Sequence, residues 1–581
     1  MLKLLRLLND YKKETALAPA FKLLEALFEL FVPLVIAQII DVGISSSDAS
    51  YTVKMCLVLI MLGFIGFAAS VIAQYFSAKA SVCFAGKLRS ALFNKIQEMS
   101  YSELDKAGTA SLITHMTSDI NQIQSGVNLT LRLFLRSPCI VFGAMIMAFT
   151  IDVKLALIFV AMIAILSAIV FAIILGTVPL YKRVQNNLSK VTRSVRENLT
   201  GVRILRGFCK ESSEVEKFIE QTDELKHSQN FVSRISSLMN PLTYVVVNVA
   251  IIGLIQGGAV TVNSGRLSQG ELVAMYNYMT QILVELVKLA NLIITITKSI
   301  ACGQRISAVM DGINDKHVGN VRDLNTSGSC PKVEFRGVKF RYDSAGDDSL
   351  TDITFKAYPG ETVGIIGGTG AGKSTLVSLI PCFYKATEGQ VLIDGVDVRD
   401  INEEILREKV SVVPQSASMF NGSIRDNLNF RDPDASDLEI LKAAEIAQAR
   451  GIIESKSGLL DAMSKQMGKN FSGGQRQRLT IARALLGDPE ILILDDSSSA
   501  LDYATEAALK RSLDRSSASR TTFIVSQRTS SIMNADKIIV LEDGCIIGLG
   551  THTELLSSCD EYREIHNLQF GAEKGGDDNE K

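Results

Sequence analysis

The sequence lacks several features that mark common classes of soluble protein. Its nine cysteines include no C-x-x-C pair, so neither a zinc site nor a disulfide framework is expected, and the thiols should be reduced. The formal net charge is only −2, so no general basic field points to nucleic acid. The first apolar run contains Lys22, Glu25 and Glu29, which is unlike a cleavable signal peptide.

Long apolar runs are present instead, and they crowd the first 310 residues. Residues 155–180 carry no charge over 26 positions, which exceeds the roughly 20 apolar residues needed to cross a bilayer as a helix. We predict a transmembrane domain over residues 1–310. Its expected membrane-spanning helices number six and lie near 15–40, 54–76, 129–151, 155–180, 242–262 and 271–297.

The basic residues indicate an orientation for these helices. Lysine and arginine are concentrated ahead of the first span and in the two long connections, 77–110 and 181–234. The intervening short connections carry only Lys154 and Arg266. Because cytoplasmic loops are enriched in basic residues, both termini and both long connections should be cytoplasmic. Residues 77–107 contain no proline, and we predict one continuous helix there, roughly 45 Å long.

Polar residues form a stripe along the sixth predicted span. Asn277, Gln281, Glu285 and Lys288 are spaced so that they share one helix face. Two interpretations stay open. Ionisable groups inside a membrane often line a substrate pathway. They can equally form structural hydrogen bonds and ion pairs between helices.

The second half has the composition of a soluble domain. We predict a polar linker over 311–332, a nucleotide-binding domain over 333–570 and a disordered tail over 571–581. Gly367 to Ser374 match the pattern G-x-x-x-x-G-K-[ST], with an apolar strand before it and an apolar helix after it. The residues expected to bind ATP are Gly367, Gly368, Thr369, Gly370, Ala371, Gly372, Lys373, Ser374 and Thr375.

The chemistry of this loop follows from its residue types. Glycines let the backbone aim its N–H groups at the phosphates. Lys373 should reach the β- and γ-phosphates, and the Ser374 hydroxyl should ligate Mg²⁺. Asp495 ends the strand "ILILD" and is the expected second anchor for Mg²⁺. ATP and Mg²⁺ are therefore the predicted cofactors.

The stretch "NFSGGQRQRLTIARALL" (470–486) resembles the signature of ATP-binding cassette (ABC) proteins. With the six spans, the whole chain is similar to a half-transporter of the multidrug-exporter type. The resemblance implies a six-helix α-helical transmembrane domain with long cytoplasmic helical extensions, followed by an α/β P-loop cassette. It also implies ATP-driven export of small or amphipathic solutes across the plasma membrane by a pair of such chains.

The resemblance assigns further roles. It implies that Tyr342 stacks on adenine, and that Gln415 ligates Mg²⁺ together with Ser374 and Asp495. It implies that the turn of Ser472, Gly473, Gly474 and Gln475 completes the site of a partner chain, and that residues 499–502 cross between cassettes. Residues 111–120 and the region near 208–218 resemble the tips that dock on the cassettes.

Two catalytic positions depart from the family pattern. Asp496 stands where a glutamate normally activates water, and the missing methylene withdraws its carboxylate by roughly 1.5 Å. Gln527 stands where the family has a histidine, and its amide cannot become cationic. General-base help typically contributes about 10²–10⁴-fold, so this site should hydrolyse ATP slowly. The segment before the signature, "SKQMGKN", also lacks the usual acidic pattern.

This combination resembles the degenerate-site subunit of bacterial heterodimeric ABC exporters. It implies a partner half-transporter with an intact glutamate and histidine. Two alternatives remain: a slow homodimer with two equal sites, or a regulatory subunit that binds ATP without lining the transport path. The six spans exclude a soluble cassette of DNA repair or translation.

Overall fold

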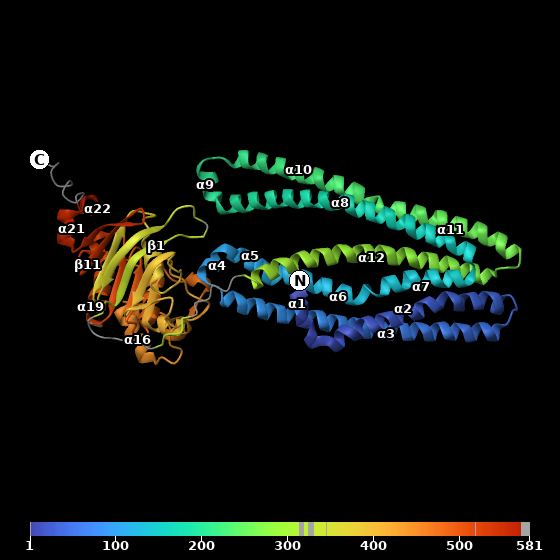
Figure 1. Cartoon of the computed structure of the whole chain (residues 1–581), viewed down its shortest axis with the longest axis horizontal. Helices are drawn as coiled ribbons and strands as arrows, with labels where there is room; N and C mark the ends of the chain where they lie inside the picture. The colour runs from blue at the N-terminus through green and yellow to red at the C-terminus, as the bar shows by residue number, and fades with distance from the viewer. Residues whose placement is uncertain (1, 313–318, 323–329, 344, 517–518, 571–581) are drawn as a thin grey trace. The chain divides into compact units, whose positions relative to one another are not determined.

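The computed structural model describes residues 2–312, 319–322, 330–343, 345–516 and 519–570. The chain divides into two compact units, shown in Figure 1. The first comprises Met1–Lys95 and Ala110–Gly312 and is helical. The second comprises Ile96–Thr109 and Ile313–Lys581 and contains the β-sheets.

The first unit consists of long helices. They are α1 (Leu2–Leu5), α2 (Lys12–Gln38), α3 (Ala49–Gln97), α5 (Thr109–Thr114), α6 (Ile120–Leu133), α7 (Arg136–Ile151), α8 (Val153–Thr200), α9 (Val202–Gly207), α10 (Glu211–Ser237), α11 (Met239–Asn263) and α12 (Gln269–Met310), with short helical turns η1 (Arg6–Tyr11), η2 (Ile39–Ile44) and η3 (His115–Asp119). Six of the described helical segments are long and apolar enough to cross a membrane, so the predicted six-helix membrane architecture is confirmed.

The third span is broken, whereas the sequence predicted one helix over 129–151. Helix α6 ends at Leu133 and α7 begins at Arg136. Pro138 follows two residues later, and it has no N–H to donate to the carbonyl of Phe134. Proline is favoured in the first turn of a helix, where it stands here, although α2 continues through Pro19 and Pro33 and α8 through Pro179. The break puts Pro138 in the first turn of α7 and places Arg136 at the start of that helix.

The prediction of one continuous helix over 77–107 is also wrong. Helix α3 ends at Gln97, and α4 (Tyr101–Ala107) starts anew after Ser100. The Ser100 hydroxyl accepts from the Glu103 N–H at 3.3 Å, and the Glu103 carboxylate accepts from the Ser100 N–H at 2.9 Å. This capping box sets the new start. Gly108, with φ +70°, ends α4.

Helix α4 belongs to the second unit. The segment that clusters with the cassette is Ile96–Thr109. Residues 111–120, predicted to form one docking tip, lie in α5, η3 and the first residue of α6, and their docking role stays a prediction. The other predicted tip, near 208–218, spans the turn between α9 and α10.

Helices α6 and α12 approach each other closely at Gly126. A Cβ atom at that position would lie 2.1 Å from the Ser299 Oγ atom, so only glycine fits without a shift. The Ser299 hydroxyl donates to the Gln122 carbonyl oxygen at 2.8 Å. Small residues and hydroxyl hydrogen bonds are the usual means by which membrane helices pack.

The second unit is built on two main sheets. Its strands are β1 (Val333–Phe340), β2 (Leu350–Ala357), β3 (Thr362–Gly367), β4 (Glu388–Ile393), β5 (Val396–Asp397), β6 (Val410–Val413), β7 (Gly422–Ser423), β8 (Met463–Ser464), β9 (Ile491–Asp495), β10 (Thr521–Val525), β11 (Lys537–Glu542) and β12 (Cys545–Gly550). One sheet has the order β12-β11-β3-β10-β9-β6, in which only β12 is antiparallel. The other, β2-β1-β4-β5, is antiparallel.

Helices cover these sheets and form a second lobe. They are α13 (Lys373–Leu379), α14 (Glu403–Lys409), α15 (Ile424–Leu428), α16 (Asp437–Ile446), α17 (Arg450–Glu454), α18 (Gly473–Leu485), α19 (Tyr503–Ser516), α20 (Thr529–Ile532), α21 (His552–Ser558) and α22 (Asp560–Phe570), with turns η4 (Leu459–Asp461) and η5 (Gln466–Gly468). The parallel strands β3, β9 and β10 end at one edge of their sheet, which is where α/β proteins bind ligands.

The described part of the predicted linker is tied to the cassette. The Val321 N–H donates to the Asp400 carbonyl at 2.9 Å, and the Asn402 N–H donates to the Val321 carbonyl at 2.9 Å. The predicted tail, 571–581, lies outside the described residues.

Candidate nucleotide-binding site

The loop between β3 and α13 is shaped by left-handed glycines. Gly370 and Gly372 have φ values of +86° and +93°. A Cβ atom on Gly372 would lie 2.8 Å from the Ser349 carbonyl oxygen. The loop curls round Lys373, whose ammonium donates to the carbonyls of Gly367 at 2.9 Å and Gly368 at 2.5 Å. The glycines are therefore required both for the backbone path and for close packing.

Lys373 carries a buried positive charge. Its exposed fraction is 9%, and burial lowers the pKa of its ammonium, while Asp496 and Asp495 oppose that shift. Within the described residues it forms no ion pair with a carboxylate at bonding distance. A buried cation with only carbonyl partners is poised to bind an anion, because a buried charge is stable only when it is paired.

Asp495 lies opposite the loop, at the end of β9. Its carboxylate accepts a hydrogen bond from the Ser374 hydroxyl at 2.9 Å. Burial raises the pKa of Asp495, and the neighbouring Asp496 raises it further, against the effects of Ser374 and Lys373. A hydroxyl and a carboxylate brought together in this way fit Mg²⁺, which prefers oxygen ligands. The donor set is therefore suited to the predicted metal.

Asp496 has an unusual backbone conformation. Its φ is +44°, which is left-handed and uncommon for a residue other than glycine. Its N–H donates to the Val525 carbonyl at 3.0 Å, which ties it to β10. The Asp496 carboxylate accepts from the Gln415 amide at 3.3 Å. Backbone strain held by its surroundings often marks a functional position.

These groups surround one cavity of about 800 Å³. Gln527, in the turn between β10 and α20, also lines it. The predicted residues that line the cavity are Tyr342, Thr369, Gly370, Ala371, Gly372, Lys373, Ser374, Thr375, Gln415, Asp495, Asp496 and Gln527. Both departures from the family pattern thus lie beside the phosphate loop.

Part of the cavity wall was not predicted from the sequence. Asp543 and Gly544, in the turn between β11 and β12, line the cavity. The Thr351 N–H donates to the Gly544 carbonyl at 2.8 Å, and a Cβ atom on Gly544 would lie 2.7 Å from the Ser349 carbonyl oxygen. The dipeptide Asp-Gly between two apolar strands is a turn signal that could have located this hairpin.

The signature turn is placed elsewhere. Ser472 caps α18: its hydroxyl accepts from the Gln475 N–H at 3.3 Å, and the Gln475 side chain accepts from the Ser472 N–H at 3.0 Å. A Cβ atom on Gly474 would lie 2.9 Å from the Ala500 carbonyl oxygen, so the turn packs on the loop at 499–502. Within the described residues, none of the four signature residues lines the cavity around Lys373.

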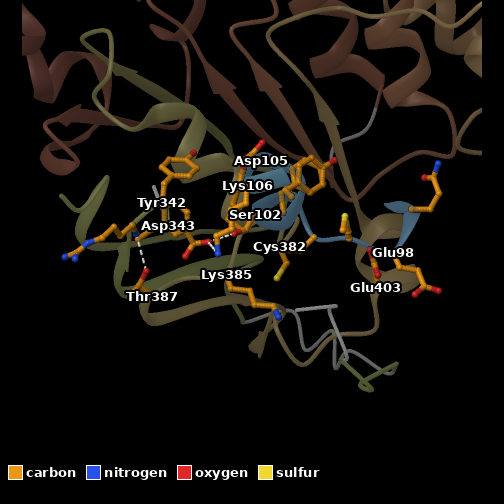
Figure 2. A pocket seen from close by; sticks show the side chains of 18 of the residues that line it. Glu98, Ser102, Asp105, Lys106, Tyr342, Asp343, Cys382, Lys385, Thr387 and Glu403 are labelled. Atoms are coloured by element: carbon orange, nitrogen blue, oxygen red, sulfur yellow. Dashed lines mark hydrogen bonds and ion pairs between the residues drawn. The ribbon is translucent and has the colours of Figure 1, made fainter. Parts of the chain in front are cut away.

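Tyr342 lies at another wall of the cavity, next to residues that contact α4. Its hydroxyl lies 3.1 Å from the Thr375 hydroxyl oxygen, and its ring meets the Tyr384 ring edge-on with centroids 5.2 Å apart. Figure 2 shows the pocket of about 420 Å³ on the other side of Tyr342, between α4 and the strands. Tyr342 therefore borders both cavities.

Helix α4 is bound to the neighbours of Tyr342. Asp343 accepts from the Ser102 hydroxyl and forms an ion pair with Lys106 at 2.9 Å (Figure 2). The Tyr384 hydroxyl donates to Asp105 at 2.7 Å. Helix α4 was not predicted from the sequence as a separate helix, although the pattern Ser-x-x-Glu at 100–103 followed by Gly108 is a usable signal.

The polar stripe on α12 lies in a buried ionic cluster of the first unit. Glu285 is only 3% exposed and accepts from Arg136 at 2.6 Å, Ser137 at 2.7 Å and Lys288 at 2.8 Å. Arg136 also pairs with Glu29 at 2.6 Å. Arg136 was not predicted to join this cluster; it begins α7, directly after the break in the third span.

The remaining charges of the cluster also balance. Lys22 pairs with Glu25 at 2.6 Å, so three cations face three carboxylates. Gln281 has a buried side-chain oxygen without a hydrogen-bond partner, and Asn277 is half-buried. The four residues predicted to share a face do lie on one stretch of α12, and the structure joins two of them, Glu285 and Lys288, directly.

Two family models match the chain. The ABC transporter transmembrane region matches residues 15–286, and the ABC transporter model matches residues 350–499. The chain is 36% identical to the uncharacterized ABC transporter ATP-binding protein YfiB of Bacillus subtilis, over 99% of each chain. This chain belongs to the ABC transporters.

Other relatives agree with this membership. This chain is 31% identical to the ATP-dependent lipid A-core flippase of Salmonella typhimurium, over 94% of each chain. Its fold matches the structure of a bacterial Atm1-family ABC exporter with ATP bound, with a TM-score of 0.80 and 22% identity, over 98% of this chain and 99% of the other. The chain is therefore a multi-pass membrane protein with a fused ATP-binding domain.

Proposed function

We propose that this ABC transporter is one half of a heterodimeric exporter of small or amphipathic solutes, and that its own Walker site retains ATP and hydrolyses it slowly. The observation that carries the proposal is that Asp496 and Gln527 line the same cavity as Lys373. The similarity to a lipid A-core flippase supports an amphipathic cargo. The basic long connections support cytoplasmic termini in a plasma membrane.

The cavity binds ATP through groups that the fold has already arranged. Tyr342 offers its ring to adenine, the backbone of Thr369–Thr375 surrounds the phosphates, and Lys373 pairs with their charge, whereas Gly367 and Gly368 are not among the residues that line the cavity. Ser374, Asp495 and Gln415 would hold Mg²⁺, which would supply positive charge to offset that of the phosphates.

Slow hydrolysis follows from the two substituted positions. The Asp496 side chain is short, and its carboxylate already accepts a hydrogen bond from the Gln415 amide. The carboxylate is therefore poorly placed to take a proton from water. Gln527 can donate a hydrogen bond to the γ-phosphate but cannot carry a positive charge. ATP is bound at this site without efficient cleavage.

The signature turn serves the other site. The N-terminus of α18 presents free N–H groups and a positive helix dipole, which suit a phosphate. Since the turn does not line its own chain's cavity, the phosphate comes from the partner's nucleotide. Asp343 and Tyr384 connect the nucleotide cavity to α4, so cassette closure can displace the helices that continue from it.

The test is to restore the family residues. In the purified complex, with the partner's catalytic glutamate replaced by glutamine, Asp496→Glu with Gln527→His should raise single-turnover hydrolysis by about 10²-fold. Asp496→Asn in the same background is the matched control and should stay at the wild-type rate. Intact mass of the complex should show two different chains.

Two results would overturn the proposal. One is brisk Mg²⁺-dependent hydrolysis by the chain purified alone, which would indicate an active homodimer. The other is faster cleavage over Lys373 of this chain than over the equivalent lysine of the partner.

A further inference from the structure

We propose that Gln569, on the last helix α22, is a positioning residue that fixes the loop bearing Gln527 and so controls how long ATP stays in this chain's site. The inference rests on the proposed function in one respect, namely that the Gln527 side chain faces the γ-phosphate.

A single amide makes the connection. The Gln569 side-chain N–H donates to the Gln527 backbone carbonyl at 2.7 Å. Its side-chain oxygen accepts from the Thr529 N–H and from the Thr529 hydroxyl, both at 2.8 Å. The amide thus bridges the turn between β10 and α20 on both sides of Arg528. A glutamine is suited to this because one side chain supplies a donor and an acceptor together.

Helix α22 is anchored without Gln569. Tyr562 is fully buried among apolar residues that include Ile532, Ile538 and Leu555. Its hydroxyl is hydrogen-bonded to His552 Nδ1 at 2.7 Å. Gln569 itself is exposed and lies about two helical turns beyond Tyr562. Its three hydrogen bonds therefore secure the loop and are not needed to pack the helix.

Gln569 holds the one carbonyl of this loop that lies next to the Gln527 side chain. Further along, the Ser531 N–H donates to the Arg528 carbonyl at 3.2 Å and Arg528 pairs with Glu506 at 3.6 Å. On the N-terminal side the Ser526 N–H donates to the Ile365 carbonyl at 3.1 Å, and the Arg528 N–H donates to the Ser526 hydroxyl at 3.0 Å. The Gln527 carbonyl is held by Gln569. Rotation of this peptide would turn the Gln527 side chain away from the cavity that it lines. Small displacements of a group that contacts a phosphate are costly.

The experiment measures retention of ATP in the assembled complex. The complex is loaded with Mg²⁺ and radiolabelled 8-azido-ATP, chased with unlabelled ATP, and photolysed at intervals, and the label on this chain is counted. Gln569→Glu keeps the two acceptor contacts to Thr529 but places a carboxylate against the Gln527 carbonyl. One lost hydrogen bond predicts a loss of label about 3–10-fold faster. Leu568→Ala, at the neighbouring exposed position, is the matched control and should retain label like wild type.

A double-mutant cycle separates positioning from general loosening. Because Gln569 acts through the Gln527 side chain, Gln569→Glu should add nothing once Gln527→Ala is present. A merely structural role for Gln569 would make the two effects additive. The thermal midpoint of Gln569→Glu should match that of wild type, since α22 remains anchored at Tyr562.

The outcomes distinguish this inference from the proposed function. If Lys373→Ala abolishes labelling while Gln569→Glu retains ATP as wild type does, the positioning role is wrong and the retaining site stands. Additive effects in the cycle also overturn the positioning role. If the wild-type chain itself retains no ATP over Lys373, both proposals fail.

Discussion

In the membrane unit, Glu285 is surrounded by hydrogen-bond donors from Arg136, Ser137 and Lys288, whereas Lys373 in the nucleotide cavity donates only to backbone carbonyls among the described residues. Both regions bury charge. The membrane cluster neutralises itself with side chains of the same unit. In the nucleotide cavity, neither Lys373 nor Asp495 has a full set of partners, and the pKa of the Asp495 carboxyl is raised.

The charges of the membrane cluster therefore support the fold, whereas those of the nucleotide cavity are available to a ligand. A buried ion pair contributes little net stability to the fold, but removing one partner is costly. Buried charges without partners, by contrast, lower the stability of the ligand-free protein, and a ligand that pairs with them stabilises the folded state. Of the two interpretations of the stripe on α12, the contacts favour ion pairing between helices. Glu29 and Lys288, whose side chains are 39% and 42% exposed, are the most accessible members of the cluster.

The largest expected effect comes from breaking the membrane cluster. Glu285→Gln removes a carboxylate shared by Arg136 and Lys288, and leaving a buried cation underpaired should cost about 3–5 kcal/mol. Thermal unfolding of the detergent-solubilised complex measures this loss. Lys288→Gln is the control, since that side chain is 42% exposed and its removal should cost below about 1 kcal/mol. Unchanged stability with altered transport selectivity in Glu285→Gln would instead show that the cluster binds solute.

The opposite sign is expected in the nucleotide cavity. Asp495→Asn removes one of two adjacent carboxylates and so removes the repulsion between them. The ligand-free chain should be more stable by about 1 kcal/mol, because functional sites are commonly held at a cost in stability. The substitution should also abolish the rise in thermal midpoint that Mg²⁺ and ATP give to the wild type. Asp347→Asn, an exposed carboxylate on the same cavity, should leave both midpoints unchanged. A lower ligand-free midpoint for Asp495→Asn would contradict the comparison.

The smallest effect on stability is expected at α4, where the charges are paired but exposed. Asp343 and Lys106 have side chains 52% and 59% exposed, so Asp343→Asn should change stability by less than about 0.5 kcal/mol. Because Asp343 links the nucleotide cavity to α4, the variant should nevertheless move about threefold less solute per ATP consumed. Vesicle transport and ATPase assays on one preparation give this ratio. Glu98→Gln, which lines the same pocket, is the control, and an unchanged ratio for Asp343→Asn would remove this link.

The sequence was informative where chemistry or composition repeats over a long stretch. The six apolar helices could be predicted because a bilayer requires about 20 apolar residues in a row. The loop from Gly367 to Ser374 could be predicted because its glycines and lysine have fixed spacing. The meeting of Asp495, Asp496 and Gln527 at one cavity follows from parallel strands that end at the same edge.

Features that depend on contacts between distant residues were not predictable in the same way. The break at Phe134–Leu135 was missed because Pro138 was read inside an apolar run. The partners of Glu285 come from α7, and no local pattern connects that helix to α12. Gln569 lies 42 residues beyond Gln527, and nothing in the spacing of the two indicates that their backbone and side chain meet.

The contact between Gly126 and Ser299 limits how the membrane unit can rearrange during a transport cycle. With no room for even a methyl group between them, α6 and α12 cannot slide or rotate past each other at this level without losing the Ser299 hydrogen bond. The two helices should therefore travel as a single rod. The pivots of alternating access are then to be sought at the ends of that rod.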